Sequence, residues 1–110
     1  MNPVRTSAIL GLLFVLFTSA AGADTPAAPV RYAGGDGSSV AKAVVILGAT
    51  EMTGVGAEYQ WLDAHFQGWK GQDQSLLNQD KKVYDVMNFT MPDGSKHTVY
   101  FDITDYFGKY

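Results

Sequence analysis

Apolar and polar residues alternate over two stretches in the last third of the chain, on either side of Pro92-Asp93-Gly94. A period of two puts the apolar side chains on one face of a β-sheet. Proline followed by aspartate and glycine is typical of a tight turn, because glycine accepts the left-handed conformation. We therefore predict an antiparallel hairpin whose three-residue turn sets Met87 opposite Val99 and Val83 opposite Ile103. The apolar face of this hairpin comprises Val83, Met87, Phe89, Val99, Phe101 and Ile103.

Upstream of the hairpin, apolar residues recur at helical spacing. This pattern predicts an amphipathic helix over Val55–Gln67, which Gly68 ends in the left-handed conformation. The side chains expected to cover the apolar face of the hairpin are Val55, Tyr59, Leu62, Phe66 and Trp69. The side chains expected to face water are Glu58, Gln60, Asp63 and Gln67.

Two shorter strands complete the predicted sheet. The run Ala43–Leu47 is apolar and rich in β-branched residues, and Gly48 bounds it, which favours a buried strand. A second strand is expected around Gln74–Leu77, before a turn through residues 78–80. The predicted fold class is α+β in the order β-α-β-β-β, with one amphipathic helix packed on a mainly antiparallel sheet of three to four strands.

The start of the chain predicts export. An arginine at position 5, an apolar run from Ala8 to Phe17 and a small-residue end at positions 21–23 are typical of a secretory signal peptide, cut before Asp24. The apolar run is shorter than the roughly 20 residues that span a bilayer, so no membrane span is expected after cleavage. We predict a signal peptide at 1–23, a flexible tail rich in Pro, Gly and Ser at 24–39, and a single domain at 40–110. The expected location is the periplasm or the extracellular medium.

Composition narrows the classes of partner. The formal net charge is −3, which gives no electrostatic reason to bind nucleic acid. There is no cysteine, so the small domain has no disulfide to support it, and homodimerisation is an alternative source of stability. The glycines between Gly48 and Gly56 match neither the dinucleotide fingerprint nor the P-loop, so no cofactor is expected. His65 and His97 have no second histidine at a metal-ligand spacing, and no metal site is expected.

The carboxylates of the hairpin suggest two roles, a buried structural residue or a catalytic pair. Strand alternation places Asp85 on the apolar face, where we expect a structural role with donors from the loop Gly48–Gly54 or from a tryptophan indole. The alternative is a minimal acid-based hydrolase that uses Asp85 and Asp102. We assign no catalytic residue, because so short a chain is not expected to form a large cleft.

The opposite face of the hairpin carries tyrosines. Tyrosine combines a large contact area with a polar tip, so this face is a candidate surface for a protein, peptide or glycan. The alternative is that the tail or the chain end covers it. The candidate binding residues are Tyr84, Tyr100, Asp102 and Tyr106.

Several short motifs carry a family resemblance. An Ala-Glu-Tyr segment at 57–59 and a Tyr-Asp dipeptide at 84–85 precede Tyr-Phe-Asp-Ile at 100–103 and Phe-Gly-Lys at 107–109. This combination resembles a group of small exported bacterial proteins of unknown function, over residues 40–109. The resemblance implies one compact domain and no particular activity.

These observations favour a small exported protein that binds without catalysis, through the tyrosine-bearing sheet face or an exposed strand edge. The expected partner is an envelope protein, a peptide or a glycan. The alternatives are the hydrolase described above and a purely structural subunit associated with the envelope.

Export makes a direct prediction about the mature chain. Mass spectrometry of the protein from the periplasm or the medium is expected to find Asp24, or a residue within about two positions of it, at the N-terminus. An intact Met1 terminus in the membrane fraction would instead indicate an anchor.

Overall fold

The computed structural model describes residues 29–110, apart from the side chain of Gln72. The predicted signal peptide, its cleavage before Asp24 and the first part of the predicted tail lie outside the described residues.

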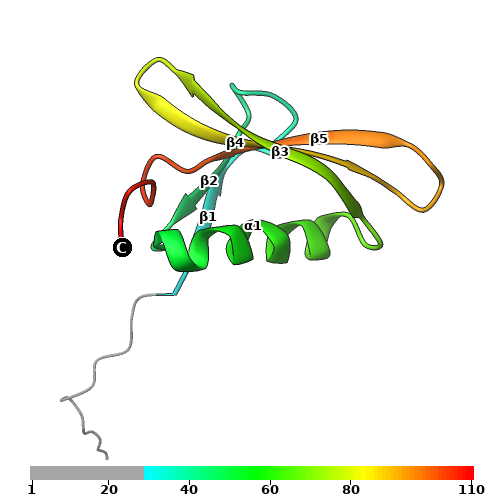
Figure 1. The fold of residues 1–110 in the computed structure, drawn as a ribbon, viewed down its shortest axis with the longest axis horizontal. Coiled ribbons are helices and arrows are strands. Elements are labelled where there is room, and N and C mark those ends of the chain that lie inside the picture. The colour runs from blue at the N-terminus through cyan, green and yellow to red at the C-terminus, as the bar shows by residue number, and fades with distance from the viewer. Residues whose placement is uncertain (1–28) are drawn as a thin grey trace, which may run out of the picture.

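Five strands and one helix make up the described chain, in the order β-β-α-β-β-β. The elements are β1 (Arg31–Gly34), β2 (Val44–Leu47), α1 (Glu51–His65), β3 (Lys70–Gln79), β4 (Lys82–Thr90) and β5 (Lys96–Asp102). The strands form one sheet in the order β1-β2-β5-β4-β3, in which the β2–β5 pair alone is parallel. The helix lies along one face of this twisted sheet (Figure 1). The α+β class is therefore confirmed, with one strand more than predicted.

The additional strand is β1, which falls inside the predicted flexible tail. Arg31–Gly34 pairs antiparallel with β2, so the expectation of a tail over 24–39 is wrong for these residues. The Tyr32 hydroxyl also donates a 2.6 Å hydrogen bond to the carbonyl of Ala57 in α1. Backbone pairing and this bond hold a segment whose composition alone predicts no structure.

The predicted hairpin forms in the predicted register. Met87 lies opposite Val99, and the N–H of Ile103 donates to the carbonyl of Val83 at 2.9 Å. The turn at 92–94 closes on a 2.9 Å bond from the N–H of Met91 to the carbonyl of Ser95. Gly94 has a φ of 86°, which is the left-handed conformation that the turn requires.

Strand β3 is longer than the predicted strand at 74–77. It spans ten residues and turns directly into β4 through Asp80 and Lys81, with φ values of 53° and 65°. Positive φ at both positions is typical of a two-residue hairpin turn. Pairing with β4 from Lys70 to Gln79, with one register shift between Gly71 and Asp73, therefore makes a strand of a mainly polar segment.

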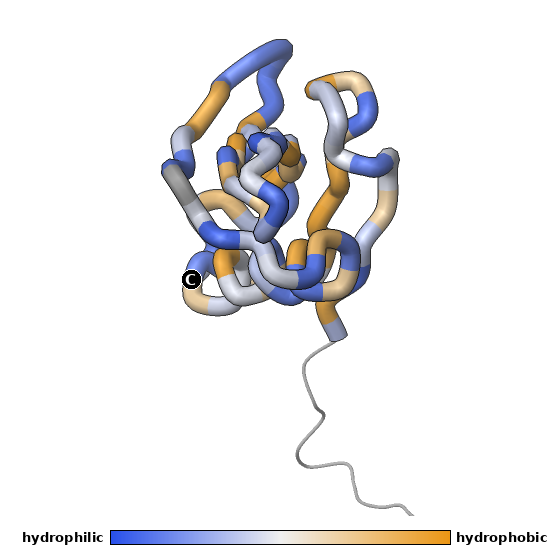
Figure 2. The backbone as a smooth tube through the Cα atoms, turned by 90° about the vertical axis from the view of Figure 1, so that its right-hand side faces the viewer, coloured by the Kyte–Doolittle hydropathy of each residue, from blue (hydrophilic) through white to orange (hydrophobic). Residues whose placement is uncertain are grey.

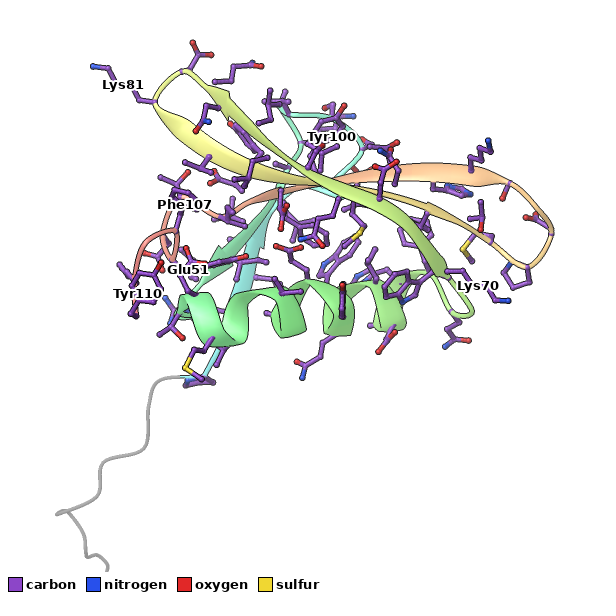
Figure 3. All side chains as sticks on the ribbon, in the orientation of Figure 1. Glu51, Lys70, Lys81, Tyr100, Phe107 and Tyr110 are labelled. Atoms are coloured by element: carbon purple, nitrogen blue, oxygen red, sulfur yellow. The ribbon has the colours of Figure 1, made fainter. Side chains whose placement is uncertain are left out.

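The end of the chain caps the start of α1. The first N–H groups of a helix have no partner within the helix. Here the N–H of Glu51 donates to the carbonyl of Lys109 at 2.7 Å, and the Glu51 carboxylate accepts from the N–H of Gly108 at 2.6 Å. Glu51, Phe107 and Tyr110 accordingly lie together at one end of the molecule (Figure 3).

The helix presents a different face to the sheet than the aromatic stripe predicts. Val55 and Tyr59 are 38% and 41% exposed, whereas Glu58, which was expected to face water, is 0% exposed. The buried helical residues are Gly54, Ala57, Glu58, Trp61 and Leu62. Small residues at 54 and 57 let the helix approach its neighbours closely, so this face packs inward.

The core fills the space between α1 and the sheet. Hydrophobic and hydrophilic residues alternate along the backbone of the domain (Figure 2). Apolar side chains of α1 and of the strands form one buried cluster. The largest fully buried side chains include Tyr106, Phe89, Phe101, Ile46 and Leu62. Within residues 29–110, no helix is long and apolar enough to cross a membrane.

Two glycines of α1 give a matched test of this packing. A Cβ at Gly54 would overlap the ring of Tyr106, whereas a Cβ at Gly56 would meet nothing within 4 Å. Gly54→Ala is expected to lower the free energy of unfolding by about 1–3 kcal/mol, through overpacking. Gly56→Ala is expected to raise it by about 0.5–1 kcal/mol, because alanine favours the helix. Urea denaturation checks both variants, and equal effects would contradict the packing described here.

Candidate functional site

The predicted tyrosine surface is largely closed. Tyr84 and Asp102 are 5% and 7% exposed, and Tyr100 is partly buried. The connection between β1 and β2 contributes to the closure, because the carbonyl of Gly37 accepts a 2.8 Å hydrogen bond from the N–H of Tyr100. Residues 39–41 of the same connection line a cavity with Tyr84. The alternative in which the tail covers this face therefore describes it better than an open surface, and residues 40 and 41 just after the predicted tail also take part.

The carboxylate of Asp102 holds the turn that follows β5. Its Oδ1 accepts from the N–H and the hydroxyl of Thr104, at 3.0 and 2.6 Å. Its Oδ2 lies 3.9 Å from the ammonium of Lys82. Asp102 thus has structural partners at both oxygens.

Tyr106 lies on the other side of the sheet from the predicted surface. It is 2% exposed and packs on the helix at Gly54. Its hydroxyl donates a 2.8 Å hydrogen bond to Oε2 of Glu58. Burial, and then the charge of Glu58, raise the pKa of this hydroxyl, so it remains a donor.

Glu58 and Asp85 form a buried acid pair. Asp85 extends from β4 on the face toward the helix and is 5% exposed. The amide nitrogen of Gln74, on β3, donates to Asp85 and, at 3.3 Å, to Glu58. These side chains differ from the loop amides and indoles predicted as partners of Asp85. The acid cluster, defined as Glu58, Gln74, Asp85 and Tyr106, joins α1, β3, β4 and the C-terminal turn.

The acid pair retains a proton at neutral pH. Burial raises the pKa of Glu58 to about 9, and the hydrogen bond and charge of Asp85 add to the effect. Two close carboxyl groups share a proton because two buried negative charges repel each other. A protonated Glu58 can accept from Tyr106 and donate its own proton to Asp85 at the same time.

The arrangement does not suit the hydrolase alternative. Asp85 lies opposite Phe101 on the helix side, whereas Asp102 lies opposite Tyr84 on the far side. Two carboxyl groups on opposite faces of a sheet cannot flank one scissile bond. The close pair is Glu58 and Asp85, and both are closed to solvent.

Sequence reasoning missed Glu58 because the larger aromatic stripe predicts that a different face of the helix is buried. The small residues that surround Glu58 on the helix are the signal that could have identified it. Gly54 lies four residues before Glu58 and Ala57 lies beside it, and Trp61 and Leu62 follow at three and four residues. A carboxyl in the middle of such a face is buried with it.

The outer edge of β3 is the open feature of the sheet. This strand pairs with β4 alone. The odd-numbered residues of β4 form backbone hydrogen bonds with β5, so its even-numbered residues form those with β3. In this register the N–H and C=O groups of Gln74, Leu76 and Asn78 point outward. Leu76 is 56% exposed, on the face toward the helix.

A groove runs between this edge and α1. It has a volume of about 190 Å³, and its lining includes Tyr59, Trp69, Gln74 and Met87. The rings of Tyr59 and Trp69 lie 5.3 Å apart and form its aromatic wall. The β3 surface is defined here as the edge of β3 with Leu76, this groove and Tyr59. Lys70 and Lys81 mark the two ends of the strand (Figure 3).

Within residues 29–110, no group of three His, Asp or Glu side chains is placed to hold a metal ion. Comparison of the chain with protein-family models, with curated proteins and with solved structures finds no match. The resemblance to small exported bacterial proteins stays a prediction.

The acid pair predicts that stability falls as pH rises. A carboxyl with a raised pKa contributes stability that is fully present below its unfolded value, near 4.5, and is lost as pH rises through about 9. Over this interval the free energy of unfolding is expected to decrease by up to about 1.4 kcal/mol per pH unit for this one proton. Urea denaturation at a series of pH values measures the slope.

Glu58→Gln copies the protonated side chain and has no proton to lose, so it is expected to flatten the slope. Asp85→Asn removes a charge that raises the pKa of Glu58, and it is expected to move the decline to lower pH. An unchanged pH profile in Glu58→Gln would show that Glu58 is ionised in the folded protein.

Proposed function

We propose that the protein is a small exported binding protein, without catalytic activity, that holds an extended segment of another protein along the free edge of β3. The observation that carries this proposal is the ten-residue edge strand, whose outward backbone groups at Gln74, Leu76 and Asn78 have no strand partner among the described residues. A peptide that adds a strand to such an edge gains main-chain hydrogen bonds along its length.

The β3 surface supports side-chain recognition beside the backbone pairing. Every second residue of an added strand would face the groove between β3 and α1. There the aromatic rings of Tyr59 and Trp69 and the exposed Leu76 favour an apolar side chain. The preferred partner is therefore an extended, largely uncharged segment with at least one apolar residue on its helix-facing side.

The features that protect this edge lie toward the two ends of β3. Soluble proteins commonly place lysine or proline along exposed strand edges, since these residues discourage strand addition. The outward-bonding positions at 74, 76 and 78 are Gln, Leu and Asn. Lys70 begins the strand, a register shift lies between Gly71 and Asp73, and Lys81 lies in the turn after the strand. An edge that carries no charge from residue 74 to residue 79 is consistent with use as a binding site.

Substitution of Leu76 tests the proposal. Leu76→Pro removes an outward N–H that the sheet itself does not use, and Leu76→Lys adds a charge at the centre of the edge. A displayed library of random linear peptides serves as the probe. Peptides selected on the unmodified mature chain are expected to lose at least about tenfold in affinity for both variants, as for the loss of a central hydrogen bond and apolar contact.

The matched control is Gln67→Lys, which adds the same charge at an exposed position outside β3. It is expected to bind the selected peptides as the unmodified chain does. Failure to select any linear peptide, or selected peptides that tolerate Leu76→Pro, would overturn the proposal. Self-association that Leu76→Lys abolishes would replace the foreign segment by a second copy of the chain.

A further inference from the structure

A second cavity lies on the other side of α1 from the β3 surface. It has a volume of about 530 Å³ and is bounded by the C-terminal part of α1, the first half of β5 and the connection between β1 and β2. The histidine pocket is defined here by its lining residues Asp36, Trp61, His65, Phe66 and His97. Its volume is in the range of small-molecule sites.

The hydrogen bond of His65 shows which nitrogen of its ring carries a proton. Nδ1 lies 2.9 Å from the carbonyl oxygen of Trp61, and a carbonyl only accepts, so Nδ1 carries the proton. In the neutral ring, Nε2 is then an acceptor. The described residues provide no hydrogen-bond partner for it.

Two successive hydrogen bonds in the neighbouring turn orient the ring of His97. The hydroxyl of Ser95 donates to Asp93 at 2.6 Å, so it accepts from Nε2 of His97 at 3.0 Å. In the neutral ring the remaining nitrogen, Nδ1, is an acceptor. The pocket is thus lined by two imidazoles that, in their neutral forms, each have one acceptor nitrogen uncommitted within residues 29–110.

Asp36 adds a fixed carboxylate to the lining. Its Oδ1 accepts from the hydroxyl and the N–H of Ser38, at 2.6 and 3.0 Å, and these bonds lower its pKa. Its Oδ2 has no hydrogen bond to a described residue. The positive charge of Lys42 also lowers this pKa, so a basic side chain partly balances the carboxylate nearby.

Trp61 contributes a hydrogen-bond donor to the pocket lining, whereas the preceding residues contribute acceptors. It is 7% exposed and lines the pocket, and its indole N–H donates to no described residue. Buried indole N–H groups usually find an acceptor. The residues that line the pocket therefore carry one unpaired donor and, with neutral imidazoles, three uncommitted acceptor atoms.

The walls of the pocket are aromatic. The ring of His65 stacks on Trp61 with centroids 3.9 Å apart and planes 12° apart, and His97 stacks on Phe89 at 5.7 Å and 15°. Phe66 lies between the two pairs, 5.4 Å from His97 and 6.2 Å from Trp61. These stacks hold the polar ring edges in place.

We propose that the histidine pocket binds a neutral carbohydrate. A sugar hydroxyl donates and accepts, so it can satisfy the Trp61 N–H together with the acceptors on His65, His97 and Asp36. An ammonium ion offers donors only and leaves the Trp61 N–H unpaired, whereas an anion is repelled by Asp36. The C–H faces of a sugar suit the aromatic walls. This site is independent of the β3 surface.

Nuclear magnetic resonance tests the proposal directly, because Trp61 and Trp69 each give one indole N–H signal. The probes are glucose, galactose and N-acetylglucosamine, with glucosamine and glucuronate as charged counterparts. At least one neutral sugar is expected to shift the Trp61 indole signal in a saturable way at millimolar concentration, with a smaller effect on Trp69. Tighter binding of a charged counterpart, or the absence of a saturable shift with all three neutral sugars, would overturn the proposal.

Two variants locate the site. Asp36→Asn can still accept from Ser38 but has no charge, and His65→Phe keeps a ring on Trp61 but loses the acceptor nitrogen. Each is expected to weaken sugar binding by about tenfold. Asp80→Asn makes the same charge change at the β3–β4 turn, outside the pocket, and is expected to bind as the unmodified chain does. Binding that survives both pocket variants would place the sugar elsewhere and overturn the assignment.

Discussion

The contact between Glu58 and its three partners joins the helix to the rest of the domain. Tyr106 comes from the C-terminal turn, Gln74 from the edge strand β3 and Asp85 from its neighbour β4. A buried carboxyl is tolerated only when it is hydrogen-bonded or protonated, and Glu58 meets both conditions. Because these partners come from separate segments, the cluster sets the rotation of α1 about its axis.

That rotation decides which apolar side chains remain outside. When Glu58 and Ala57 turn inward, Val55 and Tyr59 turn toward solvent beside β3. The groove and the exposed ring of Tyr59 are consequences of burying the acid. The features that we propose for strand binding therefore depend on the same contact that orders the core.

The two proposed sites use different properties of one helix. The β3 surface offers unpaired backbone groups and an apolar wall, which suit an extended polypeptide. The histidine pocket offers mixed donors and acceptors between aromatic rings, which suit a hydroxylated small molecule. The histidine pocket and the groove beside β3 share no lining residue. The two sites can therefore be tested independently.

The hairpin and the existence of the helix could be predicted from the sequence, because each depends on local periodicity and on turn residues. Pro92-Asp93-Gly94 specifies a loop length, and the loop length specifies that Met87 meets Val99. The burial of Asp85 follows from the same alternation. For these elements the interactions that matter lie within a few residues or across one turn.

Tertiary structure alone decided which face of α1 is buried, the pairing of β1 and the closure of the tyrosine face. Two stripes compete on the helix and share Leu62, one with Val55 and Tyr59 and the other with Gly54 and Glu58. Residue hydrophobicity favours the first. The ring of Tyr106, about fifty residues away in the chain, fits against Gly54 and favours the second. Close approach between distant segments, which no local pattern encodes, placed Glu58 inside and the ring of Tyr59 at the surface.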